Sequence, residues 1–458
     1  MKTFSTKPTD ENALKMFELD GVERNDCIVR FVNLLDAIDG ECTIALNGDW
    51  GSGKTFFVKQ TKLLLDFFNP QSDLEDDVKN RVQQIAQTLR LENVKNYATV
   101  YYDAWMNDNA EDPILSLIHE TLKDVPVSVP SKRKNLLSIA AALVDAVPFI
   151  TGKGLTNLLE KAKGEDFLKE LKDEEYIRGL VRQFIDELIV ERGNRLVFFV
   201  DELDRCKPEY AIKLLERIKH YFDDERIIFV FSVNMSQLQH TIRAYYGANF
   251  SATRYLDKFF DLRISLPTIN YQNYINKCFP FMATSWYSDK ICVEVIKHFN
   301  FSLRETERYV RLCKIAYNKK LSRNGEKLFS VAHAYFIPIA LGMSMRDISA
   351  YEQFINGESE NILFNILPET SLNKRYAKRL MLQDHEFFSQ QECRHDRDVV
   401  VNYEERMKAY YRAFFCKNPF PENEKDDYET YEMNSVRRHV NQILSLLSWA
   451  CDYTLEDC

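Results

Sequence analysis

Residues 48–55 read GDWGSGKT and satisfy the pattern G-x-x-x-x-G-K-S/T, the spacing of a loop that binds nucleotide phosphates. The glycines let the backbone fold into a concave cradle whose N–H groups point at phosphate oxygens. Lys54 is expected to bridge the β- and γ-phosphates. The Thr55 hydroxyl is expected to ligate magnesium, since this hard cation prefers oxygen donors. The predicted nucleotide-contacting residues are Gly48, Asp49, Trp50, Gly51, Ser52, Gly53, Lys54, Thr55 and Phe56.

An acidic pair, Asp201 and Glu202, directly follows the apolar run LVFFV at 196–200. A carboxylate at the tip of a buried strand can hold magnesium, and a neighbouring carboxylate can orient and polarise an attacking water. We therefore expect Asp201 to share the metal with Thr55, and Glu202 to be catalytic. Acidic pairs after strands are also common surface features, so this interpretation depends on the phosphate loop upstream.

Asn234 is a third catalytic candidate. It follows the apolar run at 227–233, where a polar side chain could reach the γ-phosphate or the lytic water. The same residue is equally well placed to cap a helix that begins at Met235. The sequence leaves both interpretations open.

These side chains need a scaffold that brings strand ends together. Apolar runs rich in β-branched and aromatic residues predict buried strands, and the stretches between them have helical periodicity. The strands are expected at 42–46, 98–102, 196–200, 227–233 and 262–266, and the helices at 55–68, 74–91, 113–122, 173–191, 208–222 and 235–246. This alternation predicts an α/β fold with a parallel sheet flanked by helices. The run at 98–102 is expected to be inserted between the phosphate-loop strand and the acidic strand.

Beyond about residue 270 the strand signal fades, and apolar residues recur at helical spacing. We predict a nucleotide-binding core at 1–269, with a helical insertion at about 107–194, and an α-helical domain at 270–458. Within the insertion, the apolar segment 136–150 contains Asp145 and Pro148 and falls short of the ~20 residues of a bilayer span. It predicts a buried or partner-facing helix, with a membrane-surface role as a minor alternative.

The composition excludes several classes of function. With 60 Lys and Arg against 69 Asp and Glu, the net charge is −9, so the chain is no general polyanion binder. The ten cysteines show no C-x-x-C spacing and the eight histidines no clustered pattern, so a zinc site is not expected. The N-terminus lacks the apolar stretch of a signal peptide, so a reducing cytoplasm is the expected setting.

Four blocks of the sequence resemble the KAP-type P-loop NTPases, a branch near the AAA+ and STAND ATPases. The blocks are residues 48–55, 102–105 (YDAW), 199–206 (FVDELDRC) and 254–262 (RYLDKFFDL) leading to Leu266-Pro267. The resemblance covers roughly residues 20–310. It implies the roles assigned above to the phosphate loop and to Asp201 and Glu202, although the family often has Asp where this chain has Glu202.

The resemblance also bears on arginines, because charge developing on the γ-phosphate needs a cation. Arg304 is similar to the sensor arginine that related ATPases place early in the helical domain, and Arg254 and Arg308 are rivals. Arg205, inside the acidic block, is expected to pair with Asp204 rather than to act in catalysis.

Many relatives carry transmembrane helices between their nucleotide motifs. Segment 136–150 lies in that interval but is too short and interrupted for such a hairpin, so membrane attachment is not expected. Some relatives act in bacterial anti-phage defence, a context implied by likeness alone.

The sequence thus favours a magnesium-dependent ATPase that switches a helical domain, within an oligomer or against a partner protein. ATP is favoured over GTP because no N-K-x-D guanine motif is present, and the adenine pocket is expected around 20–26. One alternative is a nucleic-acid-dependent motor or loader that uses basic runs, and the other is a low-turnover ATP-binding scaffold. The basic runs are Lys132-Arg133-Lys134, Lys374-Arg375 and Lys378-Arg379.

Overall fold

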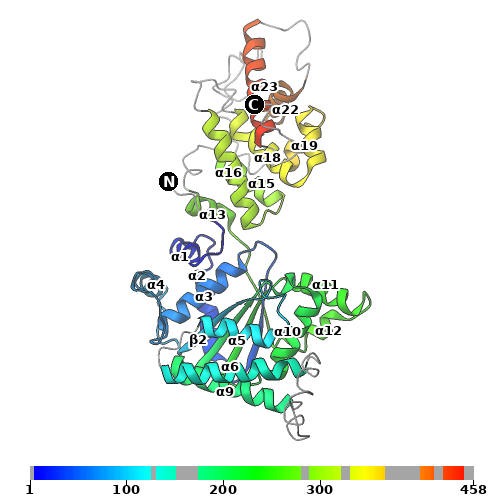
Figure 1. The fold of residues 1–458 in the computed structure, drawn as a ribbon. Coiled ribbons are helices and arrows are strands. Elements are labelled where there is room, and N and C mark those ends of the chain that lie inside the picture. The colour runs from blue at the N-terminus through cyan, green and yellow to red at the C-terminus, as the bar shows by residue number, and fades with distance from the viewer. Residues whose placement is uncertain are drawn as a thin grey trace. The chain divides into compact units, whose positions relative to one another are not determined.

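The computed structural model describes residues 5–124, 130–150, 174–279, 288–320, 331–366, 403–416 and 427–447. The chain divides into two compact units, one formed by Lys7–Thr268 and the other by Met1–Thr6 with Ile269–Cys458. The first unit contains a β-sheet (Figure 1), and it carries the predicted phosphate and acidic motifs.

The sheet has five parallel strands in the order β2-β3-β4-β1-β5. Their bounds are β1 (Cys42–Asn47), β2 (Tyr97–Asp103), β3 (Arg195–Asp201), β4 (Ile227–Val233) and β5 (Leu262–Ser265). Each predicted strand is therefore present, and the predicted parallel α/β sheet is confirmed. One predicted position was wrong, because β4 rather than β2 separates β1 from β3, and β2 lies at the edge beyond β3. Local periodicity identifies a strand but does not specify its neighbours.

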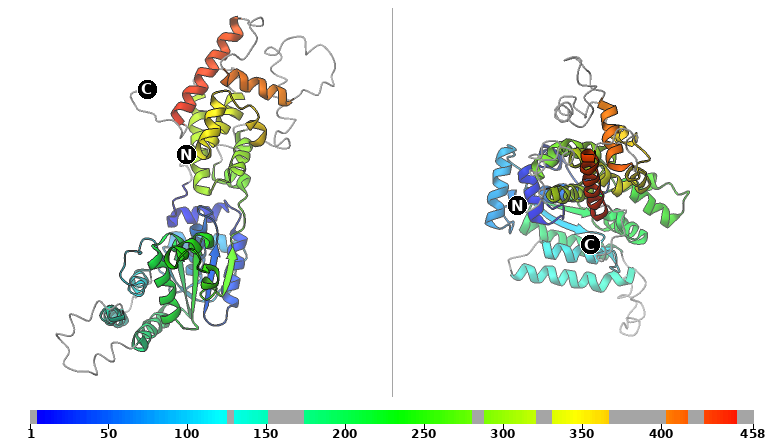
Figure 2. Two further views of the ribbon diagram at one scale, coloured as in Figure 1. Left: turned by 90° about the vertical axis from the view of Figure 1, so that its right-hand side faces the viewer. Right: turned by 90° about the horizontal axis from the view of Figure 1, so that it is seen from above.

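Both faces of the sheet are buried, because apolar side chains alternate between them. In β3, Val197 and Phe199 face one helical layer, whereas Phe198 and Val200 face the other. The first layer is α1 (Asp10–Leu19), α2 (Asn25–Ala37), α3 (Lys54–Phe68) and α4 (Asp76–Thr88). The second layer is α5 (Pro113–Asp124), α6 (Pro130–Ile150), α9 (Glu174–Arg192), α10 (Pro208–Tyr221), α11 (Met235–Tyr246) and α12 (Ala252–Leu256) (Figure 2). The six predicted helices correspond to α3, α4, α5, α9, α10 and α11, whereas α1, α2 and α12 were not predicted.

Helix α6 contains the apolar segment 136–150. Leu136, Leu143 and Ala146 are buried in the core that α6 shares with α9, whereas Leu137 and Val144 are exposed. The predicted helix is therefore confirmed with one buried face, and the partner-facing alternative remains a prediction. None of the helices that the structure describes is long and apolar enough to cross a membrane.

All the regular secondary structure that the structure describes in the second unit is helical, which confirms the predicted class of this region. Its elements are α13 (Tyr271–Cys278), α15 (Ser288–His298), α16 (Leu303–Lys320), the π-helix η2 (Ala332–Phe336), α18 (Ile337–Arg346), α19 (Ile348–Ile355), α20 (Ile362–Ile366), α22 (Tyr403–Phe415) and α23 (Asp427–Leu447). The basic run at 374–379 lies outside the described residues.

Candidate nucleotide-binding site

The phosphate-loop motif forms the turn between β1 and α3, and α3 begins at Lys54. Gly51 and Gly53 have φ of 73° and 90°, a left-handed conformation that is strained for a residue with a Cβ. At Gly48 the constraint is close approach, because a Cβ there would lie 2.7 Å from Ser52 Oγ. The glycines thus determine the shape of the loop, which leads into a helix N-terminus where the dipole favours an anion.

Lys54 is buried, and its ammonium group lies against the loop. Its Nζ donates to the carbonyl oxygens of Gly48 at 2.6 Å and Asp49 at 3.2 Å. Burial lowers the pKa of Lys54, and nearby carboxylates, above all Asp204, oppose this shift. The buried Ser52 hydroxyl has no hydrogen-bond partner among the described residues. An unpartnered buried hydroxyl is costly, and a phosphate oxygen would satisfy it.

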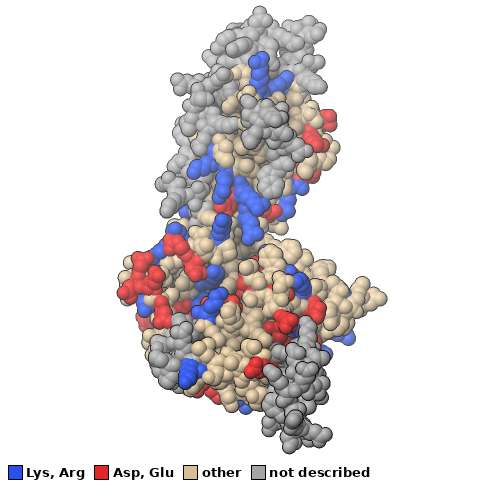
Figure 3. Space-filling model, viewed as in Figure 1, with Lys and Arg blue, Asp and Glu red and all other residues tan. Residues whose placement is uncertain are grey.

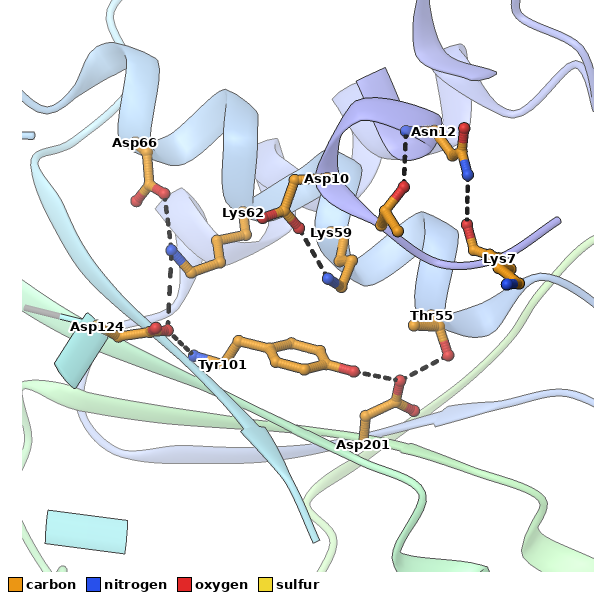
Figure 4. A network of polar contacts seen from close by, with 11 residues as sticks. Lys7, Asp10, Asn12, Thr55, Lys59, Lys62, Asp66, Tyr101, Asp124 and Asp201 are labelled. Atoms are coloured by element: carbon orange, nitrogen blue, oxygen red, sulfur yellow. Dashed lines mark hydrogen bonds and ion pairs between the residues drawn. The ribbon is translucent and has the colours of Figure 1, made fainter. Parts of the chain in front are cut away.

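Asp201 lies at the end of β3, where it is almost fully buried. Its Oδ2 accepts hydrogen bonds from Thr55 Oγ1 at 2.6 Å and from the Tyr101 hydroxyl at 3.1 Å (Figure 4). Its Oδ1 accepts from the backbone N–H of Glu202 at 3.0 Å. The two predicted metal ligands, Thr55 and Asp201, are therefore in direct contact although they lie far apart in sequence.

Tyr101 is a site residue that the sequence analysis missed. It lies on β2, and its partner in the neighbouring strand β3 is Phe199, so its side chain reaches the end of β3. Its backbone N–H donates to Asp124 Oδ2 at 2.7 Å, and Lys59 Nζ lies 5.0 Å from the centroid of its ring. Burial and the charge of Asp201 raise the pKa of its hydroxyl, which therefore stays protonated and donates. Only the strand order, which is not encoded locally, would have revealed this contact.

The oxygen atoms around Asp201 fit a magnesium ion. Thr55 supplies a hydroxyl and Asp201 a carboxylate, and the two oxygen atoms lie 2.6 Å apart. Hard oxygen donors of this kind suit magnesium, which keeps several of its waters. Within the described part of the chain, no group of three or more His, Cys, Asp or Glu could hold a metal ion by itself. A magnesium ion shared with phosphate oxygens needs fewer protein ligands.

Glu202 has an unusual backbone and an unusual carboxyl group. Its φ is 61°, the left-handed region that residues with a Cβ seldom adopt, and such strain gathers at functional sites. The pKa of its carboxyl is raised to about 7, mainly by burial and next by the negative charge of Asp201, whereas Arg205 lowers this pKa. Its carboxylate forms an ion pair with the Arg205 guanidinium.

The expected pairing of Arg205 with Asp204 is wrong, because Arg205 pairs with Glu202. These residues lie i, i+3 around the 3₁₀ turn η1 (Leu203–Arg205), and such side chains eclipse one another. The Arg205 guanidinium lies 5.8 Å from the ring centroid of Trp50 and 5.6 Å from that of Trp105. Asp204 Oδ2 accepts a hydrogen bond from Trp50 Nε1 at 2.5 Å instead.

Asn234 caps α11, as one of its two interpretations predicted. Its Oδ1 accepts from the backbone N–H groups of Ser236 at 3.1 Å and Gln237 at 3.2 Å. Its Nδ2 lies 3.5 Å from Asp49 Oδ1 in the phosphate loop. The cap is confirmed, and the catalytic role remains a prediction.

Arg24 connects the phosphate loop to the chain beyond β5, and no local pattern in the sequence predicts these contacts. One guanidinium nitrogen donates to the Ser52 carbonyl at 2.7 Å, and the other to the Pro267 carbonyl, beyond β5, at 2.5 Å. Arg24 belongs to the segment 20–26 in which the adenine pocket is expected. That segment therefore lies beside the loop.

The remaining predicted residues have positions but no tested role. Phe56 is buried in the first turn of α3. Arg254 is exposed on α12 in the first unit, whereas Arg304 and Arg308 are exposed on α16 in the helical unit. Their part in catalysis remains a prediction.

The geometry agrees with a family model. The model of the KAP family P-loop domain matches residues 24–383, which is most of the chain and includes the phosphate loop and the acidic strand end. No curated protein matches the chain with significance. The chain belongs to the KAP family of P-loop NTPases.

Proposed function

We propose that the chain is a magnesium-dependent ATPase whose site joins the phosphate loop to the acidic end of β3. The observation that carries the proposal is the 2.6 Å hydrogen bond between Thr55 Oγ1 and Asp201 Oδ2. It brings the two halves of the predicted site into contact, with Lys54 in the same loop and Glu202 directly after Asp201.

The residues have distinct tasks in the proposed reaction. Lys54 and the loop amides stabilise the negative charge that develops on the γ-phosphate. Thr55 and Asp201 hold the magnesium ion, which neutralises phosphate charge when bound. Glu202 orients the attacking water and takes up its proton. Its raised pKa, about 7, makes it a stronger base than an exposed glutamate and suits proton transfer near neutral pH.

ATP is the proposed nucleotide. The sequence has no N-K-x-D motif to select guanine. Segment 20–26 is the proposed adenine-contacting region, supported by the bonds of Arg24 to the phosphate loop and to Pro267.

Hydrolysis is proposed to switch the helical unit, either within a homo-oligomer or against a protein partner. Arg304, early in α16, is the residue proposed to sense the γ-phosphate. The family resemblance adds a biological setting, bacterial anti-phage defence. The nucleic-acid motor has less support, because Lys and Arg are interspersed with Asp and Glu on the face of the first unit drawn in Figure 3.

The test measures phosphate release and nucleotide binding by the purified full-length chain, with ATP or GTP, with magnesium or EDTA, and with or without DNA and RNA. We expect magnesium-dependent release from ATP in preference to GTP. Glu202→Gln should lower kcat by about 10²-fold or more while the chain still binds ATP. Glu209→Gln is the matched control, because Glu209 is exposed at the start of α10, and it should leave kcat unchanged.

Three outcomes would redirect the proposal. Wild-type activity in Glu202→Gln would remove Glu202 from the mechanism. ATP binding without turnover in the wild type would favour the regulatory scaffold. A salt-sensitive increase in rate on adding nucleic acid would favour the motor.

A further inference from the structure

Three loops at the carboxyl edge of the sheet are joined by one arginine. Trp50 follows β1, Trp105 follows β2 and Arg205 follows β3, so each belongs to a different strand end. The guanidinium of Arg205 lies within 6 Å of both indole centroids, at 5.8 Å and 5.6 Å, the range of cation–π attraction. The same guanidinium forms an ion pair with Glu202.

The phosphate loop itself is part of this arrangement. Trp50 is one of its residues, and the Trp50 indole N–H donates to Asp204 at 2.5 Å, next to Arg205 in the chain. A displacement of the loop on binding phosphate would therefore move the ring against which Arg205 lies. Both indoles are about half exposed, at 47% and 49%, so burying them in the core does not explain their position.

We propose that Arg205 is a positioning residue that sets the orientation of the Glu202 carboxylate and links it to the state of the phosphate loop through Trp50 and Trp105. The inference rests on the proposed function, because it gives Glu202 its task. Arginine suits this position, since its planar guanidinium can lie on aromatic faces while its N–H groups bind a carboxylate. Lysine, a compact charge on a flexible stem, would keep the charge and lose this fixed geometry.

The proposal predicts a split between binding and turnover. Arg205→Ala should lower kcat at saturating MgATP by about tenfold or more, a part of the 10²–10⁴ that a positioned base contributes. The dissociation constant for MgATP should stay unchanged, because Arg205 has no assigned contact with phosphate. Arg205→Lys should also lower kcat, which a role of charge alone would not produce.

A double-mutant cycle separates positioning from a general structural effect. In single-turnover hydrolysis, adding Arg205→Ala to Glu202→Gln should cause no further loss, because Arg205 acts through the glutamate. If Arg205→Ala lowers the single-turnover rate by the same factor in Glu202→Gln as in the wild type, the proposal is overturned. Arg226→Ala is the control, since Arg226 lies just before β4, at the amino ends of the strands, and binds Asp224 in the same loop and Asp186 on α9. It should leave kcat unchanged.

Tryptophan fluorescence reports the coupling without turnover. Binding of a non-hydrolysable ATP analogue should change the emission of the wild type, and the change should be smaller in both Trp105→Phe and Arg205→Ala. An unaltered change in both variants would overturn the link to the loop. If the wild type neither binds nor hydrolyses ATP, the proposed function itself fails; if it hydrolyses ATP and Arg205→Ala keeps the wild-type kcat, only the role of Arg205 fails.

Discussion

Replacing Tyr101 with phenylalanine should weaken the coupling between magnesium and nucleotide. The Tyr101 hydroxyl donates to the same Asp201 oxygen that accepts from Thr55. A hydrogen bond to a charged group contributes about 1.5–3 kcal/mol. The 3.1 Å distance is long for a charge-assisted O–H···O⁻ bond, so the lower end applies. A loss of about 1.5 kcal/mol corresponds to about tenfold in affinity.

The assay measures the dissociation constant of a fluorescent ADP analogue with magnesium and with EDTA. The ratio of the two constants is the metal–nucleotide coupling, which Tyr101→Phe should reduce by about tenfold, in line with the effect of residues that orient metal ligands. The constant in EDTA should not change, because the hydroxyl is not placed at the phosphate loop.

Tyr97→Phe is the matched control for this experiment. Tyr97 lies on the same strand, and its hydroxyl donates to the Asp36 carboxylate at 2.7 Å. Its removal should lower the free energy of unfolding without altering the coupling ratio. If Tyr101→Phe keeps the wild-type ratio, or if both variants change it equally, the Tyr101 hydroxyl does not couple magnesium to the nucleotide.

Further variants test the loop and the insertion. Lys54→Ala should weaken ATP binding by about tenfold or more in equilibrium titrations, since it removes a charged hydrogen-bond donor; unchanged affinity would contradict the assignment of the loop. Gly48→Ala should destabilise by about 1–3 kcal/mol in chemical denaturation, because its Cβ would lie 2.7 Å from the Ser52 hydroxyl. Gly179 is exposed in α9, and a Cβ there would meet no other atom. Gly179→Ala should therefore raise the free energy of unfolding by about 0.5–1 kcal/mol. A lower free energy of unfolding in this variant would argue against the helix. Leu143→Ala should lower the free energy of unfolding by about 2–5 kcal/mol, and Val144→Ala, at an exposed position, should lower it far less. Similar losses of unfolding free energy in the two variants would contradict the burial of one face of α6.

The strands and most flanking helices of the first unit followed from local pattern, for a physical reason. A buried parallel strand must be apolar on both faces, so the run ending at Val200 identified β3 and, with it, the place of Asp201 and Glu202. The phosphate loop was equally predictable, because φ at Gly51 and Gly53 demands glycine.

Contacts between elements could not be predicted in the same way. The position of β2 at the sheet edge, and hence the contact of Tyr101 with Asp201, depends on long-range strand pairing. The partner predicted for Arg205 was wrong, because a 3₁₀ turn that no sequence pattern predicts aligns Arg205 with Glu202 instead of Asp204.

The most direct test of a hydrolytic site at Thr55, Asp201 and Glu202 is to identify the nucleotide that stays bound after incubation with MgATP. Each protein is separated from free nucleotide, denatured, and its bound nucleotide identified by chromatography. We predict ADP on the wild type and on Glu209→Gln, and intact ATP on Glu202→Gln. A hydrolytic site at these residues is contradicted if Glu202→Gln carries ADP as the wild type does, or if none of the proteins retains a nucleotide.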